Sequence, residues 1–306
     1  MSQAGTHRQE PTPIGVVPKP PFARVPDPTI LFAARAARMR SIAENHELKP
    51  YLLFLAELIQ AQNDVQEGLV EPELPAPDTL ARAREFGMPP LDRTRFTADA
   101  AFDETFDRIV TRAQTIEMPQ AARDALARVV IADYGMRAAM IANVLADAIP
   151  VEALAEHVFV AAAMQVHFVR LAGQLEAKSL VPIGDTAICP ACGGPPAASM
   201  VVGWQGAEGT RYCSCALCAT LWNYVRIKCC LCGTTKGISY EEVEGAGGLA
   251  KAETCDSCRS YLKIFHQHKD TSIEPLADDI ATLGLDLLMK DTEYRRGGFN
   301  PFLLGY

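Results

Sequence analysis

Four pairs of cysteines stand out in the second half of this 306-residue chain. Each pair has the pattern C-x2-C, and the pairs are Cys189 with Cys192, Cys215 with Cys218, Cys229 with Cys232, and Cys255 with Cys258. A gap of 22 residues separates the first pair from the second and, again, the third pair from the fourth, whereas 10 residues separate the second pair from the third. The repeated gap indicates a duplication, with two pairs in a first unit and two pairs in a second unit.

The C-x2-C pattern is typical of metal-binding turns. Two intervening residues let both sulfurs face one ion, and the glycines after Cys192 and Cys232 supply the backbone freedom that such a turn uses. Two turns brought together complete a tetrahedral four-sulfur site, so we expect two ions, one in each unit. The affinity order for divalent ions favours zinc over Fe(II), but the spacing does not decide between zinc and iron. Ion binding at comparable small sites contributes on the order of 10 kcal/mol, so we expect each unit to unfold without its ion.

Two of the ten cysteines, Cys213 and Cys230, fall outside the repeat. We expect them to be free thiols packed near the metal sites. The alternative is a redox-active role or service as substitute ligands, because thiolates beside a metal are reactive. A catalytic cysteine would need a positioned base, and His266 and His268 follow the last pair only as neighbours on a strand. We therefore predict no catalytic residue and no enzymatic activity.

Composition and charge limit the class of protein further. The first 188 residues contain no cysteine, and the N-terminus lacks the basic and apolar stretches of a secretory signal, so we expect a cytoplasmic protein. In a reducing compartment, paired cysteines more often hold metal or do redox work than form disulfides. The apolar stretch over residues 158–169 is too short for a membrane span. The net charge of −8 argues against the basic surface of a nucleic-acid-binding protein.

The sequence predicts an α+β multidomain protein with five segments. Residues 1–28 contain seven prolines and should be extended, either as a disordered leader, which we favour, or as an arm along the body. Residues 29–184 have helical periodicity and alanine-rich stretches, so we expect an all-helical domain with at least five helices. Residues 185–227 and 228–270 should form two tandem small β modules of the rubredoxin-like or zinc-ribbon-like type, each with one four-cysteine site. Residues 271–306 should form a C-terminal helix and tail.

Several sequence segments around the cysteines resemble a known family. Residues 188–304 closely resemble the FdhE family of formate dehydrogenase accessory proteins in the segments CPACGG, GTRYCSCALCATLWNYVRIKC and KAETCDSCRSYLKIF, followed by PLADDIATLGLDLLM and NPFLL. The resemblance implies a cytoplasmic factor needed for formate dehydrogenase activity, with a helical N-terminal domain and the catalytic subunit of that enzyme as partner. It favours iron over zinc and places the family's four pairs on the eight repeated cysteines. Cys213 and Cys230 depart from the family pattern.

Three functions remain as hypotheses. The first is a maturation factor that binds the catalytic subunit of formate dehydrogenase through a metal-stabilised scaffold. The second is rubredoxin-like electron transfer or redox sensing. The third is a zinc ribbon that binds nucleic acid, with Trp222 and other aromatic side chains near Arg211 and Arg226 stacking on bases. We expect no nucleic-acid partner, because the chain has a net negative charge. The sequence does not decide the oligomeric state.

Overall fold

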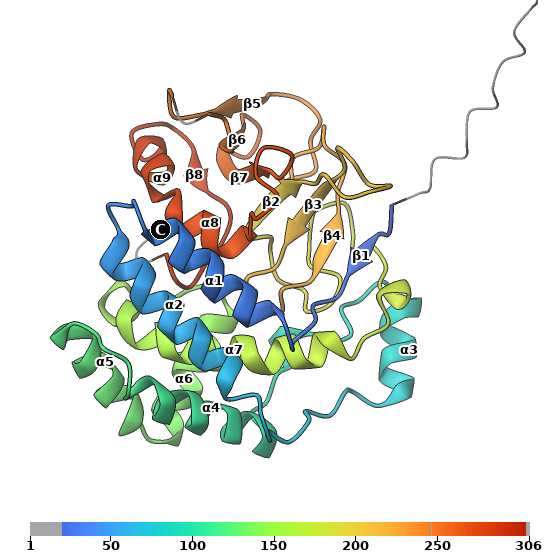
Figure 1. Cartoon of the computed structure of the whole chain (residues 1–306). Helices are drawn as coiled ribbons and strands as arrows, with labels where there is room; N and C mark the ends of the chain where they lie inside the picture. The colour runs from blue at the N-terminus through green and yellow to red at the C-terminus, as the bar shows by residue number, and fades with distance from the viewer. Residues whose placement is uncertain (1–19, 246, 304–306) are drawn as a thin grey trace, which may run out of the picture.

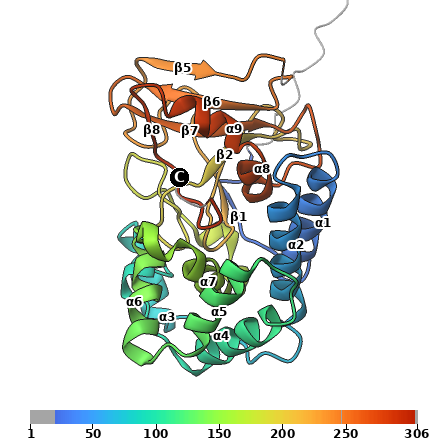
Figure 2. The same cartoon turned by 90° about the vertical axis from the view of Figure 1, so that its left-hand side faces the viewer.

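The computed structural model describes residues 20–245 and 247–303. A helical region lies against one β-sheet (Figure 1, Figure 2). Of two short helices near the C-terminus, the first lies between the helical region and the sheet, and the second packs on the first and on the sheet. Most of the proline-rich segment predicted for residues 1–28 lies outside the described residues, including Ile14, Val16 and Val17. The α+β architecture predicted from the sequence is confirmed.

The helical region is built around α7 (Leu154–Gly173), which is buried along most of its length because its sequence is apolar on every side. The other helices are α1 (Leu31–Ala43), α2 (Lys49–Asp64), α3 (Pro77–Glu85), α4 (Ala100–Ala113), α5 (Gln120–Val130) and α6 (Tyr134–Leu145), with 3-10 turns at Arg93–Arg95, Val151–Ala153 and Ala177–Ser179. Helices α2, α4, α5 and α6 contact α7, and α1 packs on α2. Across residues 20–245 and 247–303, no helix combines the length and apolarity needed to cross a bilayer.

Short polar residues and prolines set where several of these helices begin. The Asp99 side chain accepts a hydrogen bond from the backbone N–H of Phe102 at the start of α4, and Asp133 accepts one from Met136 at the start of α6. Helix α3 begins at Pro77, where the missing N–H would have no partner within the helix. These helices therefore begin where the sequence supplies a capping side chain or a proline.

Both cysteine units belong to one continuous sheet. Its strands are β1 (Ala23–Arg24), β2 (Ala198–Val201), β3 (Arg211–Ser214), β4 (Leu221–Asn223), β5 (Ile238–Glu241), β6 (Ala250–Cys255), β7 (Ser260–His266) and β8 (Arg295–Arg296). The strand order is β1-β4-β3-β2-β7-β6-β5, with β8 also paired to β7. The first unit contributes β2 to β4 as an antiparallel meander, and the second contributes β5 to β7 in the same way. A parallel pairing of β2 with β7 joins the two units.

The described part of the proline-rich segment lies along the body as an arm. In β1, Ala23 is buried and pairs with Trp222 of β4, and the carbonyl of Phe22 accepts a hydrogen bond from Asn223 N–H at 2.7 Å. The Tyr212 hydroxyl donates to the carbonyl of Pro21 at 2.6 Å. For residues 20–28 the arm is therefore the alternative that the structure adopts, and it covers the outer edge of β4.

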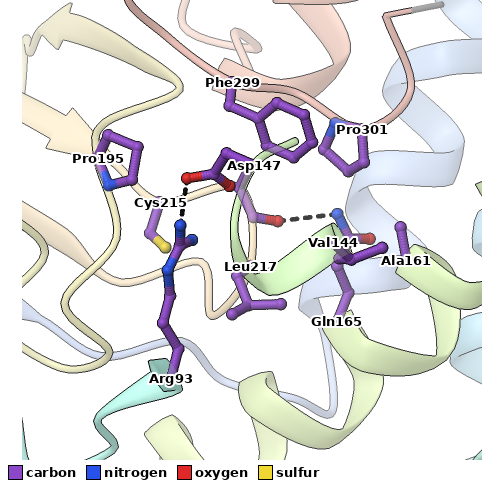
Figure 3. A pocket seen from close by; sticks show the side chains of 11 residues that line it. Arg93, Val144, Asp147, Ala161, Gln165, Pro195, Cys215, Leu217, Phe299 and Pro301 are labelled. Atoms are coloured by element: carbon purple, nitrogen blue, oxygen red, sulfur yellow. Dashed lines mark hydrogen bonds and ion pairs between the residues drawn. The ribbon is translucent and has the colours of Figure 1, made fainter. Parts of the chain in front are cut away.

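The helical region and the sheet meet at a polar junction beside the first unit (Figure 3). Arg93 forms an ion pair with Asp147, and the backbone N–H of Arg93 donates to the carbonyl of Cys192 at 3.1 Å. From α7, Gln165 Nε2 donates to the carbonyl of Ala216 at 2.8 Å. These bonds hold both cysteine turns of the first unit against the helices.

Two helices, α8 (Pro275–Ala281) and α9 (Leu283–Met289), replace the single C-terminal helix predicted from the sequence. The break lies at Thr282, beneath the buried side chain of Lys263. Lys263 Nζ donates to the backbone carbonyls of Asp279 at 2.7 Å and Thr282 at 3.1 Å. Since those carbonyls would accept backbone N–H groups in a continuous helix, the lysine stabilises the interruption.

The same lysine belongs to a buried network of four charges that fastens α8 and α9 to the sheet. Lys263 and Arg296 each form ion pairs with both Asp279 and Asp286. Burial alone would raise the pKa of Asp279, but Arg296 and Lys263 outweigh burial and hold this pKa below its ordinary value. Two positive and two negative charges thus balance inside the protein.

Two four-cysteine centres

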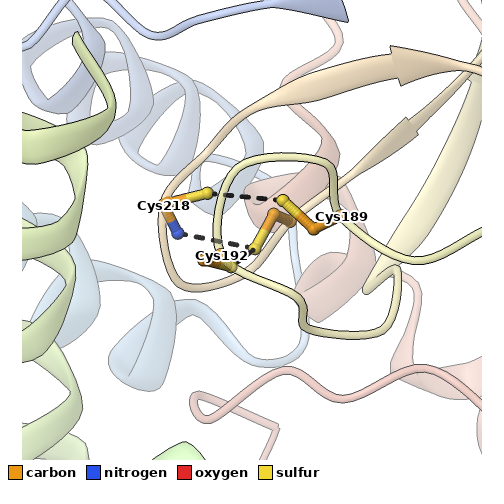
Figure 4. Close-up of side chains that lie close together, drawn as sticks. Cys189, Cys192 and Cys218 are labelled. Atoms are coloured by element: carbon orange, nitrogen blue, oxygen red, sulfur yellow. Dashed lines mark hydrogen bonds between the residues drawn. The ribbon is translucent and has the colours of Figure 1, made fainter. Parts of the chain in front are cut away.

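The first centre consists of Cys189, Cys192, Cys215 and Cys218, whose four sulfurs all lie within 4.8 Å of one another. The Sγ–Sγ distance is 3.6 Å between Cys189 and Cys218 and 3.4 Å between Cys192 and Cys215. Figure 4 shows Cys189, Cys192 and Cys218 turned toward one another from two separate loops. A tetrahedral zinc site with bonds of about 2.3 Å has sulfurs about 3.8 Å apart, so the first centre has nearly the size that an ion requires.

The second centre consists of Cys229, Cys232, Cys255 and Cys258, which also lie within 4.8 Å of one another. The Sγ–Sγ distance is 3.9 Å between Cys229 and Cys258 and 3.7 Å between Cys232 and Cys255. All eight repeated cysteines therefore gather four by four, as their spacing predicted, and these are the two four-cysteine groups among the described residues. The second centre lies nearer the surface, because Cys232 is exposed and Cys258 is half-buried, whereas every cysteine of the first centre is buried.

The backbone repeats itself from one centre to the other after 40 residues. Cys189 N–H donates to the carbonyl of Gly194 at 2.8 Å, and Cys229 N–H donates to the carbonyl of Thr234 at 2.8 Å. The residue after each second cysteine has a positive φ, at 81° for Gly193 and 75° for Gly233. In the other two turns the corresponding residues are Ala219, with φ 55°, and Arg259, with φ 52°. All four turns thus place the residue after the second cysteine in the left-handed region, and the duplication in the sequence predicts the match of the first turn with the third and of the second with the fourth.

The thiols of the first centre differ in pKa, because their surroundings differ. Burial raises the pKa of the Cys189 thiol well above its ordinary value, whereas hydrogen bonds from the other three sulfurs hold the pKa of Cys215 well below it. Four buried thiols do not all ionise without a cation, so a metal ion that binds here must displace protons. The chemistry of the donors fits a soft or borderline ion such as iron or zinc.

Arg93 supplies a fixed positive charge close to the first centre. Burial alone would lower the pKa of Arg93, but its bonds to Asp147 and the nearby sulfurs of the first centre hold this pKa above its ordinary value. A Cβ atom on Gly194 would lie 2.7 Å from Arg93 Nη1, so only glycine leaves room for the guanidinium there. Sequence reasoning missed this residue, because nothing near Arg93 in the chain indicates that it reaches the cysteine turns.

The two cysteines outside the repeat also lie together. Cys213 Sγ and Cys230 Sγ are 3.4 Å apart, and both side chains are buried. Neither sulfur belongs to either centre, and none of the ten cysteines forms a disulfide. The spacing of the cysteines in the sequence did not predict that these two sulfurs lie together, because Cys213 lies on β3 and Cys230 lies between two ligand positions of the second unit.

The aromatic residues considered for base stacking lie mainly inside the sheet region. Trp222 and Tyr212 are buried, and Arg211 between them and the second unit is buried as well. Trp204 packs its ring against Tyr212 and beneath the Arg24 guanidinium, 4.1 Å from the ring centroid. These side chains therefore contribute to the core and do not form an open stacking platform.

The arrangement defines a class of protein, in which a helical domain lies against a duplicated β unit with two closed four-sulfur centres. Comparisons with known proteins agree with this class along the whole described chain. Family models described as the N-terminal, central and C-terminal domains of FdhE match residues 20–185, 188–226 and 227–303. The chain therefore belongs to the FdhE family.

Individual relatives cover nearly the full length. An FdhE homolog of Rhizobium meliloti (strain 1021) is 50% identical over 299 residues, which are 97% of each chain. An FdhE homolog of Stutzerimonas stutzeri (strain A1501) is 37% identical over 93% of each chain. The crystal structure of the FdhE protein from Pseudomonas aeruginosa aligns with a TM-score of 0.81 and 33% identity, covering 93% of this chain and 99% of that one. The helical half is thus as much a part of the likeness as the cysteine units are.

Proposed function

We propose that this chain is an accessory factor for the maturation of formate dehydrogenase, and that it binds the catalytic subunit in the cytoplasm without catalysing a reaction itself. Membership in the FdhE family supports the proposal. The centres support it as well, because four cysteine ligands fill a tetrahedral site and leave no open position for a substrate. The ions, for which we propose iron with zinc as the alternative, stabilise the scaffold.

An exposed apolar surface at the corner of α5 and α6 is suited to a protein partner. Ile131 and Tyr134 are 80% and 81% exposed, and Met136 beside them is 56% exposed. Helix α6 is apolar along much of its length but buries only Ile141 and Val144. Contiguous exposed apolar side chains of this kind are typical of interaction sites.

The test is genetic and biochemical. Cells that lack this protein should lose formate dehydrogenase activity, and the wild-type gene should restore it. A tagged chain should retain the catalytic subunit of formate dehydrogenase, and Ile131→Glu with Tyr134→Glu should weaken that retention. Leu288→Glu is the matched control, since Leu288 is 57% exposed on α9, away from this surface. Full enzyme activity in cells without the protein would contradict the proposal.

Electron transfer is the second candidate, and one observation favours it. The second centre reaches the surface through Cys232, so an ion there would lie close to a docked redox partner. An iron-loaded chain should then absorb visible light in its ferric form and bleach on reduction. A colourless protein that carries only zinc after anaerobic purification would eliminate this candidate.

A further inference from the structure

Cys213 and Cys230 form a dithiol at the junction of the two units. Cys213 lies on β3 of the first unit, and Cys230 lies inside the first cysteine turn of the second unit, between Cys229 and Leu231. Their sulfurs are 3.4 Å apart, whereas the two sulfurs of a disulfide are about 2.05 Å apart. The two sulfurs must therefore approach by a further distance of about 1.4 Å to form a bond.

A buried ion pair positions this dithiol. Arg211 Nη2 donates to Cys230 Sγ and to Glu253 Oε1, the latter at 2.8 Å. Arg211 Nη1 donates to the backbone carbonyls of Arg226 and Lys228, at 3.3 Å and 3.2 Å. The guanidinium thus fixes both the sulfur of Cys230 and the chain segment that leads to it.

The dithiol is separate from the metal ligands. Each centre already has four sulfurs, and neither Cys213 nor Cys230 belongs to a four-cysteine group. The segment that carries Cys230 lies near the surface, with Ile227 70% exposed and Cys232 exposed. Because Cys213 and Cys230 are themselves buried, an oxidant reaches them only when this segment moves away from Arg211, and the nearness of the segment to the surface makes such a local opening less costly than unfolding the sheet.

We propose that Cys213 and Cys230 form a reversible disulfide that responds to peroxide. In this step, the two thiols lose two electrons and two protons, a sulfur–sulfur bond forms, and hydrogen peroxide is reduced to two molecules of water. A dithiol reductant reverses the step by thiol–disulfide exchange and becomes a disulfide itself. The bond ties the turn of Cys229, a residue of the second centre, covalently to the first unit.

The experiment uses the full chain loaded with zinc, because zinc has no redox chemistry of its own and occupies the eight repeated thiols. The chain is treated with a small excess of hydrogen peroxide and its zinc content is measured. It is then denatured in the presence of an alkylating reagent, so that buried free thiols react as well, and mapped by mass spectrometry. We expect one cross-linked peptide pair that joins Cys213 to Cys230, a loss of two alkylatable thiols, retention of both zinc ions, and recovery of the two thiols with dithiothreitol.

Variants provide the controls. Cys213→Ala and Cys230→Ala should each abolish the cross-link and leave the zinc content at two ions per chain. The wild-type peptide map decides the question even if a variant fails to fold. The proposal is overturned if both thiols remain alkylatable, if the same peroxide dose first joins cysteines of the two centres or releases zinc, or if dithiothreitol does not restore the thiols.

Discussion

A chelator should remove the two ions from the loaded chain at very different rates. The second centre is open to solvent through Cys232, so a chelator reaches it directly. The first centre is fully buried, and its turn carries Leu217, which packs into the same apolar core as α7. The first ion therefore leaves only after its turn has separated from the helices.

The cost of that separation follows from the contacts at the junction. Breaking the hydrogen bond from Gln165 to Ala216 costs about 1 kcal/mol. Exposing Leu217 costs about 1.5 to 3 kcal/mol more. Since each 1.4 kcal/mol corresponds to about a factor of ten, the first ion should leave roughly 60 to 700 times more slowly than the second.

The assay follows ion release with a chelator that changes colour on binding. Two phases of equal amplitude are expected, the fast one absent in Cys232→Ser and the slow one absent in Cys192→Ser. Leu217→Ala should accelerate the slow phase, because the turn then separates more easily, whereas Leu288→Ala on α9 should leave both phases unchanged. Release in a single phase, or a fast phase that disappears in Cys192→Ser, would refute the reasoning.

Three further predictions concern stability. Removing both ions should destabilise the sheet region by on the order of 10 kcal/mol per site. A red shift of tryptophan fluorescence should report this loss, because Trp204 and Trp222, the two tryptophans of the chain, both lie in the first unit. Unchanged fluorescence without the ions would count against a structural role of the ions. Lys263→Met should lower the free energy of unfolding in urea by about 3 to 5 kcal/mol, since it removes one of the two cations of the buried network and leaves Asp279 and Asp286 to share Arg296. Lys251→Met, which removes a more exposed partner of Glu242, should cost about 1 kcal/mol or less, and equal effects of the two substitutions would contradict the buried network. Burial lowers the pKa of His167 to about 4, so the unfolded chain binds a proton below about pH 6.5 that the folded chain does not, and the stability present above pH 6.5 should fall by up to about 3 kcal/mol as the pH approaches 4. His167→Phe should flatten that decline in acid urea titrations, and an unaltered decline would show that another group causes it.

Local patterns in the sequence predicted those parts that depend on local physics. Helical periodicity predicted that residues 29–184 are helical, and in α2 the apolar residues at helical spacing, Leu52, Leu55 and Ile59, are all in the core. The C-x2-C spacing identified both centres, because a short turn fixes the relation between two sulfurs within a few residues. Duplication was evident from the equal gaps and is borne out by the matching turns of Gly193 and Gly233.

Long-range features could not be predicted in this way, because they depend on which surfaces meet. The parallel pairing of Ser199 with Ile264 joins strands 65 residues apart, and no local pattern specifies it. The helix break at Thr282 depends on a lysine from β7 that reaches into the C-terminal segment. The nearness of Cys213 to Cys230 likewise results from the way the two units are joined.

The join between the units has a consequence for assembly. The first strand of the first unit, β2, pairs with the last strand of the second unit, β7, so the two units are joined head to tail in one sheet, and this mode of pairing does not close on itself. Each end of the sheet therefore presents the strand on which a further unit of the same kind would pair. At one end β1 occupies that position, so the N-terminal arm ends the sheet there. At the other end β5 is a short edge strand that ends at Glu241 and is followed by Glu242, and charges at a sheet edge discourage the pairing of a further strand.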